Sequence, residues 1–335
     1  MSAGALITRL LQLIPVLLGV SVIVFLMITL TPGDPVEIML SGQNATPEQE
    51  AALRHDMGLD RPLWQRFAAF LVNAFQGDFG LSFFHRRPVI DVIAERLPAT
   101  IELTLVALII ALAIAIPLGV LAAVKKNTFL DRIATVGALI GISVPGFWFG
   151  ILLIILFAVK LHWLPVSGRI GFEFEVPPIT RLYLVDTLIQ GRFDAFWDAL
   201  KHIALPAVTL GLPMAAIVMR VTRASMLDVL SRDYITFAEA KGLSRRRVLF
   251  RHALKNALIP TVTVAALETG SLLGGNMVVE TVFGWPGLGR LVVESIFARN
   301  YPLVQAAVLL YALTYVFLNF VADILYTVLN PRIRL

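Results

Sequence analysis

The stretch that decides the organisation of this chain runs from residue 223 to residue 260. It is Arg223-Ala-Ser-Met-Leu-Asp-Val-Leu-Ser-Arg-Asp-Tyr-Ile-Thr-Phe-Ala-Glu-Ala-Lys-Gly-Leu-Ser-Arg-Arg-Arg-Val-Leu-Phe-Arg-His-Ala-Leu-Lys-Asn-Ala-Leu-Ile-Pro260. Residues 220–255 carry nine Lys and Arg residues against three Asp and Glu residues, which is too much charge for a segment in lipid. Apolar and aromatic side chains recur at helical spacing, at Leu227, Leu230, Tyr234 and Ala238. The pattern predicts a short amphipathic helix outside the membrane.

The end of this helix is marked by turn-forming residues. Gly242 suits the left-handed position that ends a helix, and Ser244 suits the N-cap of the next one. A short amphipathic helix that emerges from a membrane domain fits the groove of a partner protein. Alternatively, it is a surface helix that only links two spans.

Composition places the chain among membrane proteins that cross the bilayer several times. Of its 335 residues, 58% are hydrophobic and 15% are charged. A soluble domain is about half apolar and about one quarter charged. The sequence contains no cysteine, which excludes disulfides, thiolate metal sites and a cysteine nucleophile within this chain.

Six apolar stretches have the length of about 20 residues that a transmembrane helix needs. We therefore expect an all-α membrane protein with one domain over residues 1–335. The first stretch is too long for a signal-peptide core and lacks a cleavage site after it, so we expect it to be retained. The predicted spans are residues 9–30, 98–124, 132–159, 199–220, 256–280 and 303–329.

The distribution of Lys and Arg predicts the orientation of these spans. The short loop at 125–132 and the insert at 220–255 carry concentrated positive charge, and such segments stay in the cytoplasm. Both termini are then cytoplasmic as well. Because the net charge of +5 is explained by this topology, we expect no nucleic-acid partner.

The outer segments are predicted to be structured. In the loop at 31–97, Thr46-Pro-Glu-Gln49 has the pattern of a capping box, Gly58 can stop that helix, and residues 62–76 have the pattern of an amphipathic helix. The stretch Phe283-Gly-Trp-Pro-Gly-Leu-Gly289 is rich in turn residues and unfit for lipid exposure. We expect it to fold back into the protein.

The sequence carries no catalytic or phosphate-binding motif of the common kinds. It contains no G-x-x-x-x-G-K-[ST], no H-E-x-x-H and no G-x-S-x-G, so we expect neither an enzyme nor a metal site on this chain. Glu268, in the middle of the fifth span, is costly there unless it is paired or hydrated. With Thr261, Ser271 and Gly275 it is a candidate for the wall of a translocation path. Alternatively, it makes a structural hydrogen bond, which is what we expect of Asp323.

An ordered set of motifs resembles a known family over nearly the whole chain. The chain is similar to the inner-membrane permease subunits of bacterial binding-protein-dependent ABC importers, in the branch for dipeptides, oligopeptides and nickel. The motifs that carry the resemblance are Pro32-Gly-Asp-Pro35, Gly77-Asp-Phe-Gly-Leu-Ser82, Arg96-Leu-Pro-Ala-Thr-Ile-Glu-Leu103, Leu164-Pro-Val-Ser-Gly168, Ala238-Glu-Ala-Lys-Gly-Leu243, His252-Ala-Leu-Lys-Asn-Ala-Leu-Ile-Pro260, Glu280-Thr-Val-Phe-Gly-Trp-Pro-Gly-Leu-Gly289 and Asn330-Pro-Arg-Ile-Arg334.

The resemblance implies the type I importer permease fold and a coupling helix within residues 223–243. That helix would dock on a separate ATPase subunit through Leu227, Leu230, Tyr234, Ala238, Lys241 and Gly242. The sequence departs from the general importer pattern Glu-Ala-Ala-x-x-x-Gly, because those three positions are Thr236, Phe237 and Ala238. No role for a glutamate is therefore carried over.

The resemblance also implies the partners and the solute. A second, homologous permease, two ATPase subunits and an extracytoplasmic binding protein would complete the importer in the bacterial inner membrane. ATP and Mg²⁺ would bind to the ATPase subunits, and this chain would hold no cofactor. The long loop at 168–198 resembles the dipeptide and oligopeptide members. Nickel chelates and glutathione remain alternative solutes, and a self-contained secondary transporter using Glu268 is the alternative from another class.

The predicted topology is testable with reporter fusions. Fusions after residues 126 and 245 should report the cytoplasm, and fusions after residues 60, 185 and 292 should report the outside, because of the positive charge at 125–132 and 220–255. An outside signal after residue 245 would contradict the docking role of the insert.

Overall fold

The structure is a computed structural model that describes residues 3–30, 35–40, 46–56, 58–274 and 276–329. Apart from an isolated bridge between Leu81 and Pro88, the regular structure of these ranges is helical. The helices are α1 (Ala3–Leu30), α2 (Pro35–Leu40), α3 (Pro47–Asp56), α4 (Leu63–Phe75), α5 (Val89–Val124), α6 (Phe129–Ser143), α7 (Gly146–Leu153), η1 (Ile154–Lys160), α8 (Tyr183–Ile189), α9 (Phe193–Leu230), α10 (Asp233–Ala240), α11 (Arg245–Arg247), η2 (Val248–Ala253), α12 (Leu254–Leu273), α13 (Met277–Val282), α14 (Leu288–Phe297) and α15 (Tyr301–Leu329).

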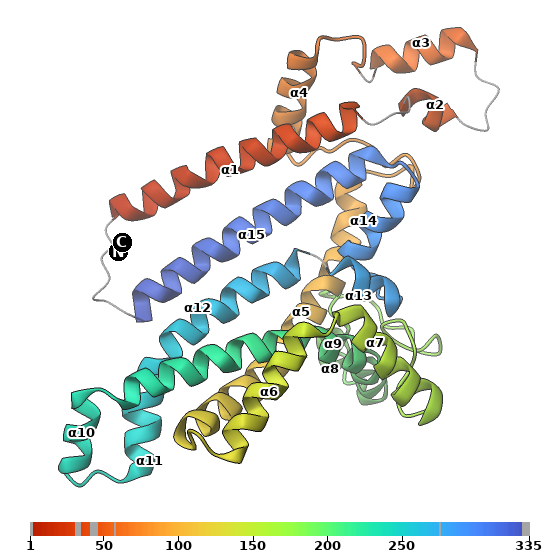
Figure 1. The fold of residues 1–335 in the computed structure, drawn as a ribbon. Coiled ribbons are helices and arrows are strands. Elements are labelled where there is room, and N and C mark those ends of the chain that lie inside the picture. Colours follow the sequence, from red (N-terminus) through yellow and green to blue (C-terminus); the bar gives the residue numbers. More distant parts are fainter. Residues whose placement is uncertain (1–2, 31–34, 41–45, 57, 275, 330–335) are drawn as a thin grey trace.

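The long helices form one tilted array (Figure 1). Helix α1 packs on α15, α15 on α12, α12 on α9, and α9 along α5, while α6 covers another side of α9. The start of α1, the end of α15, the α5–α6 connection and α10–α11 lie toward one end of the array. Helices α2–α4 and α13–α14 lie toward the other end. The segments predicted to be cytoplasmic therefore share one end.

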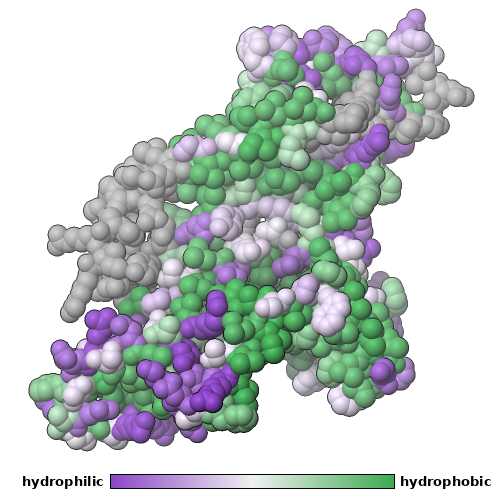
Figure 2. Space-filling view, viewed as in Figure 1, coloured by the Kyte–Doolittle hydropathy of each residue, from purple (hydrophilic) through white to green (hydrophobic). Residues whose placement is uncertain are grey.

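Four helices of the described chain are long and apolar enough to cross a membrane. They are Val89–Val124, Phe193–Leu230, Arg245–Leu273 and Tyr301–Ala322, and a fifth crossing is possible if α6 and α7–η1 count together. Helix α1 contributes a shorter apolar segment, Leu13–Met27. Hydrophobic surface gathers along the middle of the molecule, and hydrophilic surface lies at its two ends (Figure 2).

The predicted span at 132–159 contains two helices with a break between them. Helix α6 ends at Ser143, Val144 is extended, and α7 begins after Pro145 with a bend of 103° between the two parts. Proline has no N–H for the helix ladder, and its ring disfavours a helical residue before it. Pro145 therefore breaks this apolar stretch.

The predicted span at 256–280 is also too long. Helix α12 ends at Leu273, and a separate short helix, α13, begins at Met277. The intervening sequence is Gly-Gly-Asn, which has poor helix propensity. Gly275 lies outside the described residues.

The predicted structure of the outer segments is confirmed. The Thr46 and Gln49 side chains exchange hydrogen bonds with each other's backbone N–H groups, as a capping box requires. Gly58 has a φ of +63°, and residues 63–75 form α4. Phe283 and Trp285 are 2% and 1% exposed, so the turn-rich stretch does fold back into the protein.

Two glycines bring the backbones of α5 and α9 together. A Cβ at Gly119 of α5 would lie 2.7 Å from Thr222 Cβ and 2.9 Å from the Met219 carbonyl oxygen. A Cβ at Gly211 of α9 would lie 2.9 Å from the Ala107 carbonyl oxygen. Because the neighbours are backbone atoms and a branched side chain, neither site has room for a larger residue.

We predict that Gly119→Ala lowers stability by about 1–3 kcal/mol, the usual cost of overpacking a tight helix contact. The matched control is Gly137→Ala, since a Cβ at Gly137 meets no atom within 4 Å. The thermal unfolding midpoint of the detergent-solubilised permease measures the difference. Equal midpoints for both variants would contradict this prediction, because they would show that the α5–α9 contact accommodates an added methyl group.

Candidate functional site

The insert at 223–260 comprises the end of α9, the short elements α10, α11 and η2, and the start of α12. Helix α9 ends at Leu230, and α10 begins at Asp233 after Arg232 adopts an extended conformation. Gly242 follows α10 with a φ of +77°, which confirms its predicted left-handed role. Ser244 stands at the N-cap of α11, but its side chain makes no capping hydrogen bond. The insert is thus a helical hairpin whose short arm is α10.

One face of α10 is buried inside this chain. Ile235 and Ala238 are 2% and 7% exposed, and both belong to an apolar cluster beneath the helix. Leu227 and Leu230 of α9 pack against the same cluster. Its other buried members come from α5, α9, η2 and α12: Val120, Ala123, Met226, Val229, Val248, Ala253 and Ala257.

The opposite face of α10 presents aromatic side chains to solvent. Tyr234 and Phe237 are 43% and 60% exposed. The Lys241 Nζ lies 4.4 Å from the centre of the Phe237 ring, a cation–π distance. The Tyr234 hydroxyl accepts a hydrogen bond of 2.9 Å from the Asn256 side-chain amide, which ties α10 to α12. This exposed face, made by Tyr234, Phe237 and Lys241, is called the α10 face below.

The residues predicted to dock on an ATPase subunit do not share one face in this structure. The break at Ser231–Arg232 restarts the helical phase, so Leu227, Leu230 and Ala238 point into the chain while Tyr234 and Lys241 point outward. Phe237 was missed as a candidate. Phe237 can be predicted from the sequence if Asp233 is taken as the start of a new helix. Tyr234 and Phe237, three positions apart, then share a face of that helix.

An ion pair fixes α6 to α9 near the start of α6. The Arg223 Nε and a terminal nitrogen donate to the two carboxylate oxygens of Asp131 at 2.6 and 2.8 Å. Asp131 also accepts the backbone N–H of Asn127, which has a φ of +64°. A bidentate pair with a nearly buried carboxylate constrains geometry more than a single contact does.

The residues proposed for a translocation path differ in their burial along α12. Thr261 is fully buried, with its hydroxyl 3.2 Å from that of Thr222 on α9. Glu268 is partly exposed, and Ser271 is exposed. Within the described chain, Glu268 forms neither an ion pair nor a hydrogen bond, so the structural hydrogen bond considered as the alternative for this residue is not found. Gly275 lies outside the described residues, and so does the side chain of Asp323.

A buried carboxylate organises the outer end of the molecule. Glu280 is 1% exposed; it accepts hydrogen bonds from the Thr100 hydroxyl at 2.8 Å and from the Arg290 backbone N–H at 2.9 Å. The Thr100 hydroxyl in turn accepts the Leu288 N–H at 2.8 Å. Glu280 therefore caps the N-terminus of α14 and ties it to α5.

Glycine is required around this carboxylate. A Cβ on Gly287 would overlap the Glu280 carboxylate, and one on Gly289 would lie 3.0 Å from it. The Trp285 indole donates to the Ala99 carbonyl oxygen at 2.9 Å, which adds a second tie to α5. Burial raises the pKa of Glu280, although the hydrogen bonds from Arg290, Thr100 and Gly289 oppose the rise.

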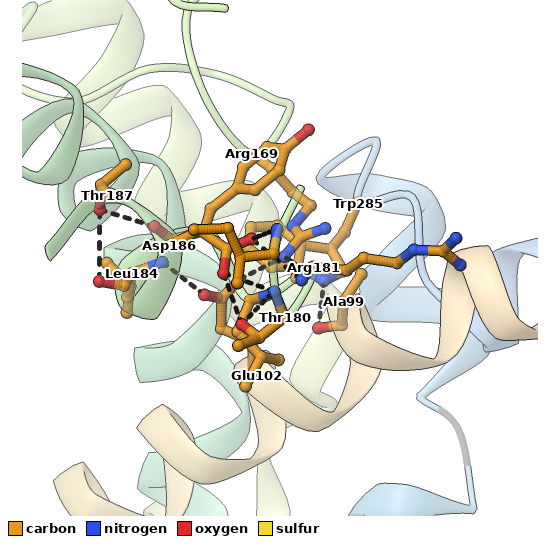
Figure 3. A network of polar contacts seen from close by, with 12 residues as sticks. Ala99, Glu102, Arg169, Thr180, Arg181, Leu184, Asp186, Thr187 and Trp285 are labelled. Carbon is orange, nitrogen blue, oxygen red and sulfur yellow. Dashed lines mark hydrogen bonds and ion pairs between the residues drawn. The ribbon is translucent and has the colours of Figure 1, made fainter. Parts of the chain in front are cut away.

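A second polar network holds the segment around residues 169–187 on α5 (Figure 3). Arg169 donates to Glu102 at 2.5 Å, and its guanidinium lies 4.1 Å from the centre of the Tyr183 ring. Glu102 also accepts the Leu184 N–H at 2.7 Å. Both charged side chains are buried, so the pair fixes one position of the segment.

Asp186 closes the turn beside this network. It is fully buried and accepts hydrogen bonds from the backbone N–H groups of residues 179, 180 and 181 and from the Thr180 hydroxyl. Burial alone raises the pKa of this carboxyl, but these hydrogen bonds outweigh it and hold the pKa below its ordinary value.

Two family profiles cover nearly all of the chain. Residues 115–335 match the family described as binding-protein-dependent transport system inner membrane component. Residues 4–104 match the family of N-terminal parts of membrane components of such transport systems.

Relatives with assigned names match along almost the full length. The chain is 44% identical to a di/tripeptide transport system permease protein DppB of Pseudomonas aeruginosa over 326 residues, 97% of both chains. It is 44% identical to the dipeptide transport system permease protein DppB of Escherichia coli strain K12 over 329 residues, again 97% of both. It is also 44% identical to the glutathione transport system permease protein GsiC of that strain over 328 residues, 98% of both.

A solved structure shows the same fold. A chain of the MetNI methionine ABC transporter, in a structure titled as inward-facing, superposes with a TM-score of 0.52 at 18% identity. The match covers 71% of the present chain and 96% of the other.

The two faces of α10 predict opposite results for the same new charge. Ala238→Asp should lower stability by about 3 kcal/mol, since it places an unpaired carboxylate against the buried cluster. Phe237→Asp should leave stability nearly unchanged, since Phe237 is 60% exposed. The yield and melting temperature of the purified permease distinguish the two variants, and equal losses would contradict the assigned orientation of α10.

Proposed function

The chain belongs to the family of binding-protein-dependent transport system inner membrane components, and on that premise we propose that it is the permease subunit of an ATP-driven importer of dipeptides. The observation that carries the solute class is the 44% identity to two DppB permeases over 97% of each chain. Glutathione is a second candidate, because the GsiC permease is equally similar. Glutathione is itself a peptide, so both candidates are small peptide-like solutes.

We propose six spans in one membrane domain of the type I importer fold, with both termini in the cytoplasm. Helices α1, α5, α9, α12 and α15 supply five of the spans, and the bent pair of α6 with α7–η1 supplies the sixth. The proposed location is the cytoplasmic membrane of a bacterium, because the family is described as inner membrane components. The common end of α1, α15 and α10–α11 supports this arrangement.

The proposed assembly contains a second permease, two ATPase subunits and an extracytoplasmic binding protein. ATP and Mg²⁺ would be bound by the ATPase subunits, which supply the hydrolysis that drives transport. This chain would supply one half of the solute path, with Glu268 and Ser271 as candidates for its wall. Specificity for the solute would rest mainly on the binding protein.

The α10 face is the proposed contact with an ATPase subunit. Phe237 is 60% exposed and lies beside the Lys241 ammonium group. Exposed aromatic side chains of this kind often anchor protein–protein interfaces. Tyr234, Lys241 and Gly242 remain proposed contacts. Leu227, Leu230 and Ala238 would support the contact from beneath by holding α10 in place.

The cluster beneath α10 explains how a movement of the ATPase would reach the membrane. Ile235 and Ala238 pack on side chains from α5, α9, η2 and α12 at once. Closely packed apolar clusters transmit displacement because they deform little. A shift of α10 would therefore move the cytoplasmic ends of three spans together, as a rigid-body transition between inward and outward access requires.

Reconstitution tests this function. We expect proteoliposomes with the full importer to accumulate labelled dipeptide only with ATP, and to continue when the proton gradient is collapsed. Labelled glutathione, supplied in place of the dipeptide, should accumulate weakly if dipeptides are the solute, and strongly if glutathione is. Uptake by this chain alone, driven by a proton gradient, would instead support a secondary transporter.

The docking contact is tested by a substitution on the α10 face. Phe237→Asp should leave the yield of folded permease unchanged but abolish co-purification of the ATPase subunits and dipeptide uptake. Phe237→Tyr keeps the ring and should retain both. Full ATPase retention in Phe237→Asp would remove the α10 face from the proposed interface.

A further inference from the structure

Helix α4 exposes an apolar face, whereas a helix on a water-facing surface exposes a polar one. Its inner face packs on α1, where the rings of Phe67 and Phe70 lie 5.3 and 6.0 Å from that of Phe25. The ring of Phe67 also lies 6.5 Å from that of Phe70. This aromatic group fixes where α4 crosses α1 and how α4 is rotated about its own axis.

Part of the polar side of α4 faces protein. Arg66 and Asn73 line a hollow of about 390 Å³ between α4, the start of α15 and the segment at 78–83. Asp78, Tyr301 and Gln305 line the same hollow. One polar edge of α4 therefore borders this hollow, although Asn73 is also exposed and Gln65 does not line the hollow.

The remaining face of α4 is apolar and uncovered. Trp64, Val72 and Phe75 are 70%, 55% and 88% exposed, and Ala68 is exposed between them. Their spacing of four, four and three residues forms one stripe along the helix. Exposure of such a stripe to water is unfavourable, because burying each large apolar side chain lowers the free energy by about 1.5–3 kcal/mol.

The contact with α1 places α4 close to the end of that helix. Phe25 lies five residues before Leu30, the last residue of α1, so the crossing is about 7.5 Å below that helix end. Amphipathic helices at a membrane surface are buried by about 5–10 Å. Helix α4 also crosses α1 at a steep angle instead of running beside it (Figure 1), as a helix in the plane of the membrane does.

Large apolar side chains are also exposed on the neighbouring span. At the same end of α1, Ile23, Met27 and Leu30 are 59%, 65% and 77% exposed. Tryptophan is enriched at the boundary between lipid and water, because its ring is apolar and its N–H is polar. Lipid is thus the occupant that agrees with the depth, the orientation and the residue types.

We propose that the stripe of Trp64, Ala68, Val72 and Phe75 lies in the outer leaflet of the membrane and anchors the 31–97 segment to it. This rests on the proposed orientation, in which that segment is outside the cell. The anchor would hold α3 and the hollow beside α4 at a fixed height above the bilayer, on the side where the binding protein arrives.

The absence of cysteine from the sequence allows a direct test by site-directed spin labelling. Ala68→Cys places a nitroxide in the stripe with little change in size. Ala52→Cys places the matched label on α3, a helix with no buried residues. Both are measured in lipid vesicles with the assembled importer, using dissolved oxygen as the lipid-phase relaxation agent and a nickel chelate as the aqueous one.

We expect the ratio of oxygen to nickel accessibility to be several times higher at residue 68 than at residue 52. Labels scanned from residue 63 to residue 75 should show maxima at 64, 68, 72 and 75. Equal ratios at 68 and 52 would show a water-facing stripe. An immobilised label at 68, shielded from both reagents, would show a protein partner on the stripe. Either result overturns the proposal.

The same labels separate this proposal from the proposed function. The measurement is repeated on the permease alone in vesicles, where no transport is needed. A membrane-impermeant thiol reagent should reach Ala52→Cys from outside intact cells. Labelling only from the inside would refute the proposed orientation, whereas correct orientation with a water-facing residue 68 would refute the anchor alone.

Discussion

The close contact between α5 and α9 is the constraint on which the other contacts depend. Gly119 and Gly211 allow the two backbones to come into contact. Other residues of α5, near both of its ends, then contact further parts of the chain. Thr100 and Glu102 hold the outer segments, and Val120 and Ala123 belong to the cluster beneath α10. Helix α5 therefore links the outer surface to the cytoplasmic-type hairpin through one continuous helix.

Buried polar contacts of Glu280 and Glu102 hold the end of the molecule opposite α10, although the Arg169 Nε has no hydrogen-bond partner there. The Glu280 carboxylate can reach the N-terminus of α14 only because Gly287 and Gly289 lack a Cβ. The Glu102–Arg169 pair fixes the neighbouring segment with a buried charge on each side. Removing one partner from such a pair costs more than the pair contributes, so these contacts specify one geometry more than they add stability.

At the opposite end, the exposed face of α10 carries the proposed contact with an ATPase subunit. Helix α10 stands on an apolar cluster shared by three long helices, and its outer face keeps two aromatic rings in solvent. Helix α4, at the outer end, likewise turns an apolar stripe away from the chain. In both places a well-packed part of the fold holds an exposed apolar surface in position. Such a surface is expected where a larger assembly or lipid covers it.

The sequence by itself determined the helical class, the apolar stretches, the capping box at Thr46 and Gln49 and the left-handed Gly242, because these follow from composition and local backbone preference. It also carried the family resemblance. The bend at Pro145 and the end of α12 have local causes, a proline and a Gly-Gly-Asn run, but only the structure gives the angle of the bend and the direction of Ala238. A hydrophobicity pattern does not show where a helix breaks, and a break of two residues at Ser231 and Arg232 rotates all that follows. The partners of Glu280 and Glu102 come from residues far apart in the chain, so no local pattern contains them.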